Sequence, residues 1–337
     1  MDTLISGAAF GAALTASGVF QPSVIISQLQ FTNFHMIQAF LTAAASSALI
    51  VTVSNKLNYA PLSPRGFSTL DLFAPYDGNI IGGLLLGAGM LLAGSCPGTV
   101  LAQVGVGVRS GIYSLEGAVV GGILYTGFIQ PWIAARRKRF AAAQAQAQAK
   151  KKEAALPLTV HEALGVSRTT VFLGLEAMFA AIVAAAALLT TPGPEAKISP
   201  VAGGLCIAAA QLLSLAVRRT LVGTSTAFEE VGEWFWGAVK AGDVQPRRYK
   251  NLLFTSGMVA GAWLLSRAYP VFAQTTPVAI APLASALGGC LMVIGSRIAG
   301  GCTSGHGITG ISLLSTSSFI TIGCAFAAGG VLGLIRG

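Results

Sequence analysis

Two cysteines of this chain stand in short runs of glycine, serine, threonine and proline, and each run interrupts a long apolar segment. Glycine tolerates backbone angles that other residues avoid and proline lacks an amide donor, so both runs are expected to break a helix. Backbone N–H groups at such a break form a concave anion site, and a thiol there gains thiolate character. A thiol is also a soft, weak donor, which suits a sulphur-bearing anion. The two runs are Gly94-Ser95-Cys96-Pro97-Gly98-Thr99 and Gly300-Gly301-Cys302-Thr303-Ser304-Gly305-His306-Gly307.

Other side chains in these runs offer weaker signals. His306 follows Cys302 by four residues, but one such pair without a second Cys/His cluster does not predict a metal site. A histidine beside a thiol instead tunes its protonation or donates to an anion. The hydroxyls of Thr99, Thr303 and Ser304 are candidate donors, although packing between spans explains them equally well.

Charged residues inside apolar segments form a second group of candidates. Arg297 precedes the second run, and an intramembrane arginine is expected to be functional or paired, with snorkelling to the interface as the alternative. Glu116 and Glu176 also lie in apolar segments, without an indicated partner. The acidic and aromatic stretch 229–236 is expected to be an interfacial amphipathic piece.

The composition predicts a multi-span membrane protein. The chain has 337 residues, of which 53% are hydrophobic and only 10% charged, and its mean hydropathy is +0.71. Seven of the 21 Lys and Arg lie between Arg136 and Lys152, so the net charge of +9 indicates membrane orientation rather than nucleic-acid binding. Cys206, Cys290 and Cys324 lie in apolar segments, where free thiols rather than disulfides are expected.

A span needs about 20 apolar residues, and that rule predicts an all-α polytopic protein with about nine spans. Four further apolar pieces are too short or too broken to cross, and they are expected to be re-entrant or half-helical. The spans run near 4–20, 34–53, 78–95, 111–134, 169–190, 199–219, 250–270, 283–300 and 316–335, and the broken pieces near 21–31, 96–109, 221–240 and 302–314.

The two halves of the chain resemble each other. When Cys96 is aligned with Cys302, several small residues on the N-terminal side align as well, and a glycine pair downstream aligns after a slip of two residues. Duplication is preferred over coincidence, because the matched positions lie in similar hydropathy patterns. The aligned positions are Gly82-Gly83 with Gly288-Gly289, Gly89 with Gly295, Ala93 with Ala299, Gly94 with Gly300, and Gly121-Gly122 with Gly329-Gly330.

Counting the spans predicts inverted repeats. We expect a first membrane repeat over 1–134, a basic cytoplasmic connector over 135–168, and a linker span plus the second repeat over 169–337. A regulatory or partner-binding arm is the alternative for the connector. With the connector inside, the two cysteine runs enter from opposite faces, which is the layout of an inverted-repeat transporter. This count requires that 221–240 does not cross.

At these motifs the chain resembles the YeeE/YedE-type sulphur transport family, whose members include thiosulfate permeases. Residues 82–99 resemble one half-size subunit type and residues 288–307 the other, while Thr15 to Ser23 also fits the first type. The resemblance implies a fusion of two half-size partners and an hourglass of spans. It also implies that short broken helices meet at the midplane of the hourglass, where thiols relay a reduced sulphur compound by hydrogen bonds.

The resemblance assigns the path-cysteine role to Cys96 and Cys302. The thiosulfate permeases also carry a cysteine near the N-terminus, and Ser17-Gly18 occupies the comparable place here. Thiosulfate, sulfide, persulfide and sulfite therefore all remain candidate cargoes. The candidate path residues are Ser17, Gly94, Ser95, Cys96, Pro97, Gly98, Thr99, Arg297, Gly300, Gly301, Cys302, Thr303, Ser304, Gly305 and His306.

The leading hypothesis is a transporter rather than an enzyme, in a lipid bilayer and with the plasma membrane favoured. A membrane thiol redox or sulphur-transfer enzyme that uses Cys96 and Cys302 is the alternative, although no Cys-x-x-Cys motif or cofactor fingerprint supports it. A third alternative, an aquaporin-like pore for neutral solutes, shares the half-helix plan. It would predict pore-lining asparagine caps rather than thiols, and this chain has no asparagine at the two motifs. The expected partners are a small sulphur-containing anion and, as an additional candidate, a soluble sulphur-carrier protein. No cofactor, metal or nucleic acid is expected.

Overall fold

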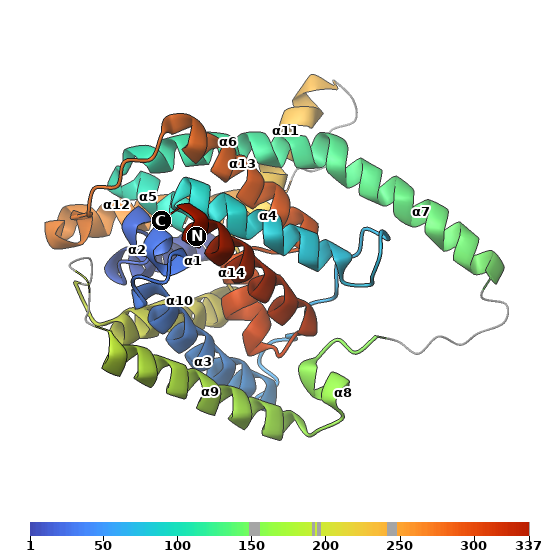
Figure 1. Ribbon diagram of the computed structural model, residues 1–337, viewed down its shortest axis with the longest axis horizontal. Helices are drawn as coiled ribbons and strands as arrows, with labels where there is room; N and C mark the ends of the chain where they lie inside the picture. The colour runs from blue at the N-terminus through green and yellow to red at the C-terminus, as the bar shows by residue number, and fades with distance from the viewer. Residues whose placement is uncertain (148–155, 191–192, 194–196, 241–247, 337) are drawn as a thin grey trace.

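The computed structural model describes residues 1–147, 156–190, 193, 197–240 and 248–336, and within these ranges the regular elements are all helical. The prediction of an all-α polytopic membrane protein is confirmed. In chain order (Figure 1), the α-helices are α1 Asp2–Ala16, α2 Pro22–Leu29, α3 His35–Lys56, α4 Asp77–Ala93, α5 Thr99–Val106, α6 Arg109–Leu124, α7 Gln130–Ala147, α8 Val160–Leu164, α9 Arg168–Leu189, α10 Pro200–Arg218, α11 Thr226–Val239, α12 Lys250–Ala268, α13 Pro282–Ala299 and α14 Thr316–Arg336; the π-helical turns η1 Tyr125–Ile129 and η4 Thr303–Gly310 and the 3-10 turn η3 Pro270–Ala273 complete the set.

Six helical stretches in the described part of the chain are long and apolar enough to cross a membrane: α3, Arg109–Arg139, α9, α10, α13 and α14. The other three expected spans correspond to α1, α4 and α12. α1 has 15 residues and α4 has 17, so at about 1.5 Å per residue both are shorter than the roughly 30 Å hydrocarbon core. α12 has 19 residues but is less apolar than the six.

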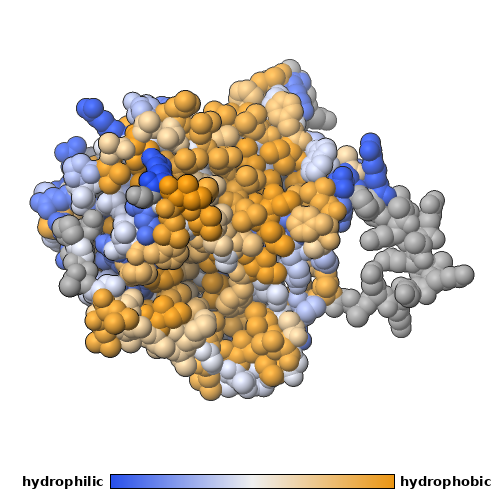
Figure 2. All heavy atoms as spheres, viewed as in Figure 1, coloured by the Kyte–Doolittle hydropathy of each residue, from blue (hydrophilic) through white to orange (hydrophobic). Residues whose placement is uncertain are grey.

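The surface has the distribution of polarity that a bilayer requires. Apolar residues cover a broad band of the face shown in Figure 2, and hydrophilic residues gather toward its left and right edges. Large side chains such as Leu173, Leu188 and Leu332 are exposed on α9 and α14. In water such a surface marks an interaction site, whereas in a membrane it is the lipid-facing belt.

The four pieces predicted to be broken are short elements. α2, α5 and η4 have 8 residues each and α11 has 14. At about 1.5 Å per residue, α11 extends only about 21 Å, so it is too short to cross. The short length of α11 favours the prediction that 221–240 does not span.

The centre of the fold is a close crossing of α4 and α13 at glycines. A Cβ atom at Gly82 would lie 2.5 Å from the backbone N of Ala299, and one at Gly288 would lie 2.5 Å from the backbone N of Ala93. The start of each helix therefore meets the end of the other, so the two helices are antiparallel. Gly82 aligns with Gly288 and Ala93 with Ala299 in the sequence, so each contact is the counterpart of the other.

The remaining helix contacts repeat in the same way. The contact of α4 with α14 in one half corresponds to the contact of α13 with α6 in the other. In the same way, the contact of α1 with α12 corresponds to that of α10 with α3. α5 contacts α12, and its counterpart η4 contacts α3. Because the aligned helices α4 and α13 run in opposite directions, this pattern is that of an inverted repeat. α9 packs along α3 at the edge of the bundle (Figure 1).

The predicted boundary between the fourth span and the connector, at 134, does not coincide with a break. α6 continues through η1 into α7, which ends at Ala147 and projects from the bundle in Figure 1. Alanine and glutamine favour helix, so the basic stretch extends the span instead of leaving it as a loop. The connector residues 148–155 lie outside the described part. The part of the connector after residue 155 packs against the bundle, where the amide of Val160 donates to the carbonyl of Leu314.

Candidate functional site

The first cysteine lies in the turn between α4 and α5. Gly94 ends α4 in the left-handed region with φ +57°, a conformation that favours glycine. The hydroxyl of Thr99 accepts from the amide of Cys96 at 2.7 Å, and the Thr99 amide donates to the Cys96 Sγ at 3.4 Å. The Thr99 hydroxyl also lies 3.3 Å from that sulphur. Thr99 therefore fixes both the backbone and the thiol at the start of α5.

The second cysteine lies in the turn between α13 and η4. Gly300 ends α13 with φ +86°, again left-handed. The Cys302 side chain is fully buried, and its Sγ lies 3.2 Å from the Ser304 hydroxyl and 3.2 Å from the Thr224 hydroxyl. The thiol thus stands inside a small set of hydroxyl groups.

Thr224 connects the two motifs, and sequence reasoning missed it. It lies in the turn between α10 and α11, far from both motifs in the chain. Its hydroxyl contacts Cys302, and it also lies 3.6 Å from the position of a Cβ at Gly98. The only sequence signal is the short polar run before α11, which marks the entry to one of the four broken pieces.

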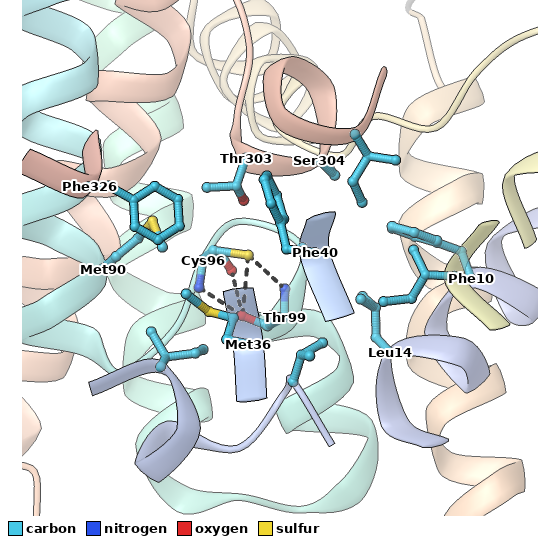
Figure 3. A pocket seen from close by; sticks show the side chains of 15 residues that line it. Phe10, Leu14, Met36, Phe40, Met90, Cys96, Thr99, Thr303, Ser304 and Phe326 are labelled. Atoms are coloured by element: carbon cyan, nitrogen blue, oxygen red, sulfur yellow. Dashed lines mark hydrogen bonds between the residues drawn. The ribbon is translucent and has the colours of Figure 1, made fainter. Parts of the chain in front are cut away.

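A small cavity separates Cys96 from the second motif. Its volume is about 60 Å³, which is enough for a few water molecules or one small ion. Figure 3 shows Cys96 and Thr99 on one side, with Thr303 and Ser304 facing them. The rest of the lining is apolar, and Met36 and Met90 add thioether sulphur to it. The full lining is Phe10, Leu14, Val19, Ile25, Met36, Phe40, Met90, Cys96, Gly98, Thr99, Ile207, Thr303, Ser304, Ile308 and Phe326.

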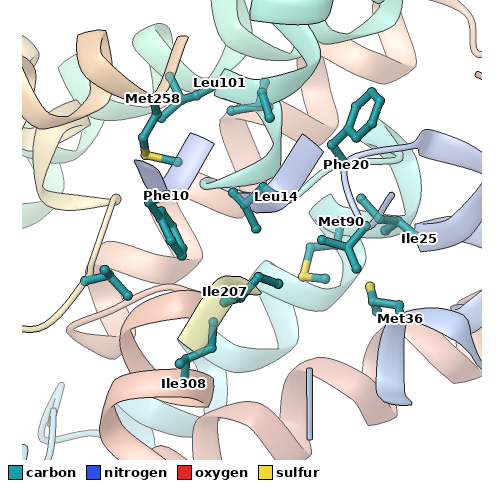
Figure 4. Close-up of a cluster of buried hydrophobic side chains, with 14 of the residues drawn as sticks. Phe10, Leu14, Phe20, Ile25, Met36, Met90, Leu101, Ile207, Met258 and Ile308 are labelled. Carbon is teal, nitrogen blue, oxygen red and sulfur yellow. The ribbon is translucent and has the colours of Figure 1, made fainter. Parts of the chain in front are cut away.

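The same apolar side chains form the main core. Phe10 and Leu14 of α1, Met90 of α4, Ile207 of α10 and Ile308 of η4 belong to one buried cluster, which Figure 4 shows from close by. The cavity is therefore enclosed by both halves of the chain. Apart from the side chains of Cys96, Thr99, Thr303 and Ser304, the lining of this cavity is apolar.

His306 anchors η4. Its Nδ1 lies 2.8 Å from the Ser318 hydroxyl and its Nε2 lies 3.1 Å from the Ala299 carbonyl. Both ring nitrogens are thus engaged with the helices on either side of the motif. The ring also lies against Gly301, where a Cβ would approach its Nε2 to 3.0 Å.

Arg65, in the loop before α4, covers the second motif. Its Nη1 donates to the Gly300 carbonyl at 3.0 Å, and its Nη2 lies 3.1 Å from the position of a Cβ at Gly305. Its backbone is held by Ser315, whose hydroxyl accepts from the Arg65 amide at 2.9 Å. The loop before α4 therefore brings a guanidinium onto the glycines around Cys302.

Arg297 forms an ion pair with Glu229 of α11. Its Nη1 also lies 3.5 Å from the Ser225 hydroxyl and 3.4 Å from the Thr226 hydroxyl. Of the alternatives weighed for Arg297, pairing is the one observed, and Arg297 does not line the cavity between the motifs.

The expectation of an interfacial piece at 229–236 was wrong for two of its acids, Glu229 and Glu230, because both are buried. Glu229 compensates Arg297. Glu230 accepts from the amide of Leu252 at 2.9 Å and from the Asn251 side chain at 2.7 Å, so it satisfies exposed donors at the start of α12.

We expect Glu229→Gln to lower stability strongly, because it leaves the Arg297 charge unpaired where both side chains are only 13% and 12% exposed. Removing one partner of a buried pair costs about 3 kcal/mol. The measurement is the Tm of the purified protein in detergent. The double variant Arg297→Met, Glu229→Leu should recover most of the loss; a double variant as unstable as Glu229→Gln would contradict the pairing.

Several other candidate path residues support the turns rather than face the cavity. Ser17 donates to the Leu14 carbonyl at 2.9 Å and packs against α10 at Gly203. The Ser95 hydroxyl lies 3.8 Å from the Met292 sulphur. Of the first motif, Cys96, Gly98 and Thr99 line the cavity, and of the second, Thr303 and Ser304 do.

Taken together, an all-α multi-pass bundle with two broken helices meeting across its interior has the arrangement of helical membrane transporters. Comparison with known proteins gives the family. The sulphur transport family model matches residues 16–332, and the chain belongs to that family. The thiosulfate transporter TsuA of Spirochaeta thermophila is 25% identical over 332 residues, which is 94% of this chain and 93% of that protein.

A shorter relative is also similar. A probable transporter of Xylella fastidiosa is 30% identical over 134 residues. That match covers 38% of this chain but 90% of the relative. A protein of about half the length thus corresponds to part of this chain, which agrees with the resemblance to half-size partners.

Proposed function

We propose that this protein is a permease for a small reduced-sulphur anion, such as thiosulfate, and that Cys96 and Cys302 relay the ion at the centre of the membrane. The observation that carries this proposal is the cavity with Cys96 on one side and Thr303 and Ser304 of the Cys302 motif on the other. Sulfide and persulfide fit the same soft lining and are secondary cargoes. The similarity to a thiosulfate transporter favours thiosulfate first.

The sequence of polar groups supports a relay. An ion leaving the Cys96 side of the cavity meets Thr303 and Ser304, and the Ser304 hydroxyl is hydrogen-bonded to Cys302. Each thiol already accepts or donates within its own turn, so the ion exchanges one set of hydrogen bonds for another. Apolar walls keep water from competing with these contacts.

The halves are proposed to be two membrane repeats, 1–134 and 169–337, joined by the basic connector 135–168. The matched helix contacts support this division. The basic residues of α7 contact the loop before α4, where Arg136 Nη2 donates to the Asp71 carbonyl at 3.0 Å. By the positive-inside rule this face is proposed to be cytoplasmic in the plasma membrane. A soluble sulphur carrier docking on it is a further proposed partner.

Growth tests the proposed cargo. A bacterial strain without its own thiosulfate uptake, expressing this chain, should grow on thiosulfate as the sole sulphur source. Growth on cysteine should be equal with and without the chain, which serves as the control for viability. Failure to grow on thiosulfate by cells that carry the chain in the membrane would contradict thiosulfate as the cargo.

The same assay separates transport from the redox or sulphur-transfer alternative. A permease delivers thiosulfate with its S–S bond intact, whereas a sulphur-transfer enzyme keeps one sulphur on a cysteine as a persulfide. Mass spectrometry of the purified protein after turnover should therefore find Cys96 and Cys302 as unmodified thiols. A stoichiometric persulfide on either would favour the enzyme instead.

Thr224 should act as a positioning residue for Cys302. Thr224→Val removes the hydroxyl that lies 3.2 Å from the thiol while keeping the shape of the side chain. One hydrogen bond is worth about 1 kcal/mol, so we expect uptake to fall about fivefold. Thr224→Ser, which keeps the hydroxyl, should retain most of the uptake. Equal uptake by Thr224→Val and the unsubstituted protein would remove Thr224 from the path.

A further inference from the structure

A large basic vestibule opens on the face that carries the connector. Its volume is about 720 Å³. It lies between the loop 57–76, the end of α10 and the start of α12. One acidic side chain, Asp2, lines it. Four cationic side chains also line it: Arg65, Arg218, Arg219 and Lys250.

In the described part of the chain, no recorded ion pair involves the four vestibule cations. The pair recorded there joins Arg297 with Glu229. Arg218 and Arg219 instead lie over the rings of Phe254 and Tyr59. The Arg65 Nε is buried and has no hydrogen-bond partner in the described chain. Unpaired cations gathered in a concave surface attract anions and raise their local concentration.

The floor of the vestibule is next to Cys302. Val222, Gly223 and Thr309 line it, and Thr224, the residue after Gly223, is hydrogen-bonded to Cys302. Arg65 lies between the two, because it lines the vestibule and also donates to the Gly300 carbonyl. An anion bound at the Arg65 guanidinium would therefore lie next to the residues that surround the Cys302 thiol.

We propose that Arg65, Arg218, Arg219 and Lys250 form a binding site for a small sulphur oxyanion on the connector side of Cys302. This inference rests on the proposed function. It adds a cationic binding site to a proposed path that otherwise consists of thiols and hydroxyls. A guanidinium offers several donors in one plane and recognises oxyanions in a bidentate manner. Arg65 supplies the contact nearest the thiol, and the other three cations hold the anion at the open end.

Equilibrium binding of isotope-labelled thiosulfate to the purified protein tests the site. Arg65→Gln should weaken binding about tenfold, the loss expected when one charge-assisted hydrogen bond is removed. Arg65→Lys, which keeps the charge but not the planar guanidinium, should weaken thiosulfate binding less. Arg267→Gln is the matched control, because Arg267 is an exposed arginine at the opposite end of α12 from Lys250, and its binding should be unchanged.

Lys250→Gln provides a second variant at the rim, where folding depends little on the exposed side chain. It should weaken binding about threefold at low salt and less at high salt. If the protein takes up thiosulfate but Arg65→Gln and Lys250→Gln bind it as tightly as the unsubstituted chain, the vestibule site is wrong and the permease proposal stands. If the unsubstituted protein neither binds nor takes up thiosulfate, both fail.

A lipid phosphate is the competing source of an anion at these cations. Adding phosphatidylglycerol to the detergent should leave thiosulfate binding by the unsubstituted protein unchanged. If Arg65→Gln abolishes binding of phosphatidylglycerol but leaves thiosulfate binding unchanged, the vestibule is a lipid site and the proposal is overturned.

Discussion

Cys96→Ala and Cys302→Ala are each expected to reduce thiosulfate-dependent growth to the background of cells without the protein. Alanine has no side-chain group that can exchange a hydrogen bond with an anion, whereas the Cys302 Sγ lies 3.2 Å from the hydroxyls of both Ser304 and Thr224. The loss should exceed that of any hydroxyl substitution, because in the proposed relay each thiol contacts the ion directly. The measurement is the growth rate on thiosulfate as sole sulphur source, normalised to the amount of protein in the membrane.

Cys206→Ala is the matched control for this prediction. Cys206 is a free cysteine on an exposed face of α10, so its removal should leave both growth and protein level unchanged. Cys302→Ser is an informative intermediate, since a hydroxyl retains hydrogen bonding without the soft sulphur. Undiminished growth of both alanine variants would remove the two thiols from the account.

Valine at the crossing of α4 and α13 should prevent folding. At Gly82 a Cβ would lie 2.5 Å from the backbone N of Ala299, and at Gly288 it would lie 2.5 Å from the backbone N of Ala93. Overpacking a core typically costs about 1–3 kcal/mol. Here the obstacle is backbone rather than a movable side chain, so the helices themselves must separate and the cost should be larger.

Size-exclusion chromatography of detergent-extracted protein measures this effect. Gly82→Val and Gly288→Val should lose the monodisperse peak. Gly323→Val is the control, because Gly323 is also a helical glycine but has no atom within 4 Å of the position of its Cβ. A normal peak for Gly82→Val would show that the two helices are farther apart than described.

The inverted-repeat arrangement could be predicted from the sequence because glycine marks it twice. Gly82 and Gly288 align with each other, and each contacts the helix that carries the other. The same residues that reveal the duplication also form the contact between the halves. The short elements at the cysteine motifs were predictable for a related reason, since Gly94 and Gly300 end α4 and α13 in the left-handed region.

The groups around Cys302 could not be predicted from the sequence. Thr224 and Arg65 come from turns that are 78 and 235 residues from their partners Cys302 and Gly300. Threonine and arginine are ordinary residues in polar turns, so their types carry no signal until the fold places them. Glu229 was expected at the membrane interface, but it is buried and pairs with Arg297. The composition of an acidic and aromatic stretch does not distinguish these two positions.

Isotope-labelled thiosulfate uptake into liposomes that contain only the purified protein tests whether the anion crosses the membrane past Cys96 and Cys302. We expect time-dependent uptake with the unsubstituted protein and with Cys206→Ala, and background uptake with Cys96→Ala and with Cys302→Ala. Uptake by either of these two variants at the rate of the unsubstituted protein, in liposomes with equal protein content, would contradict this expectation.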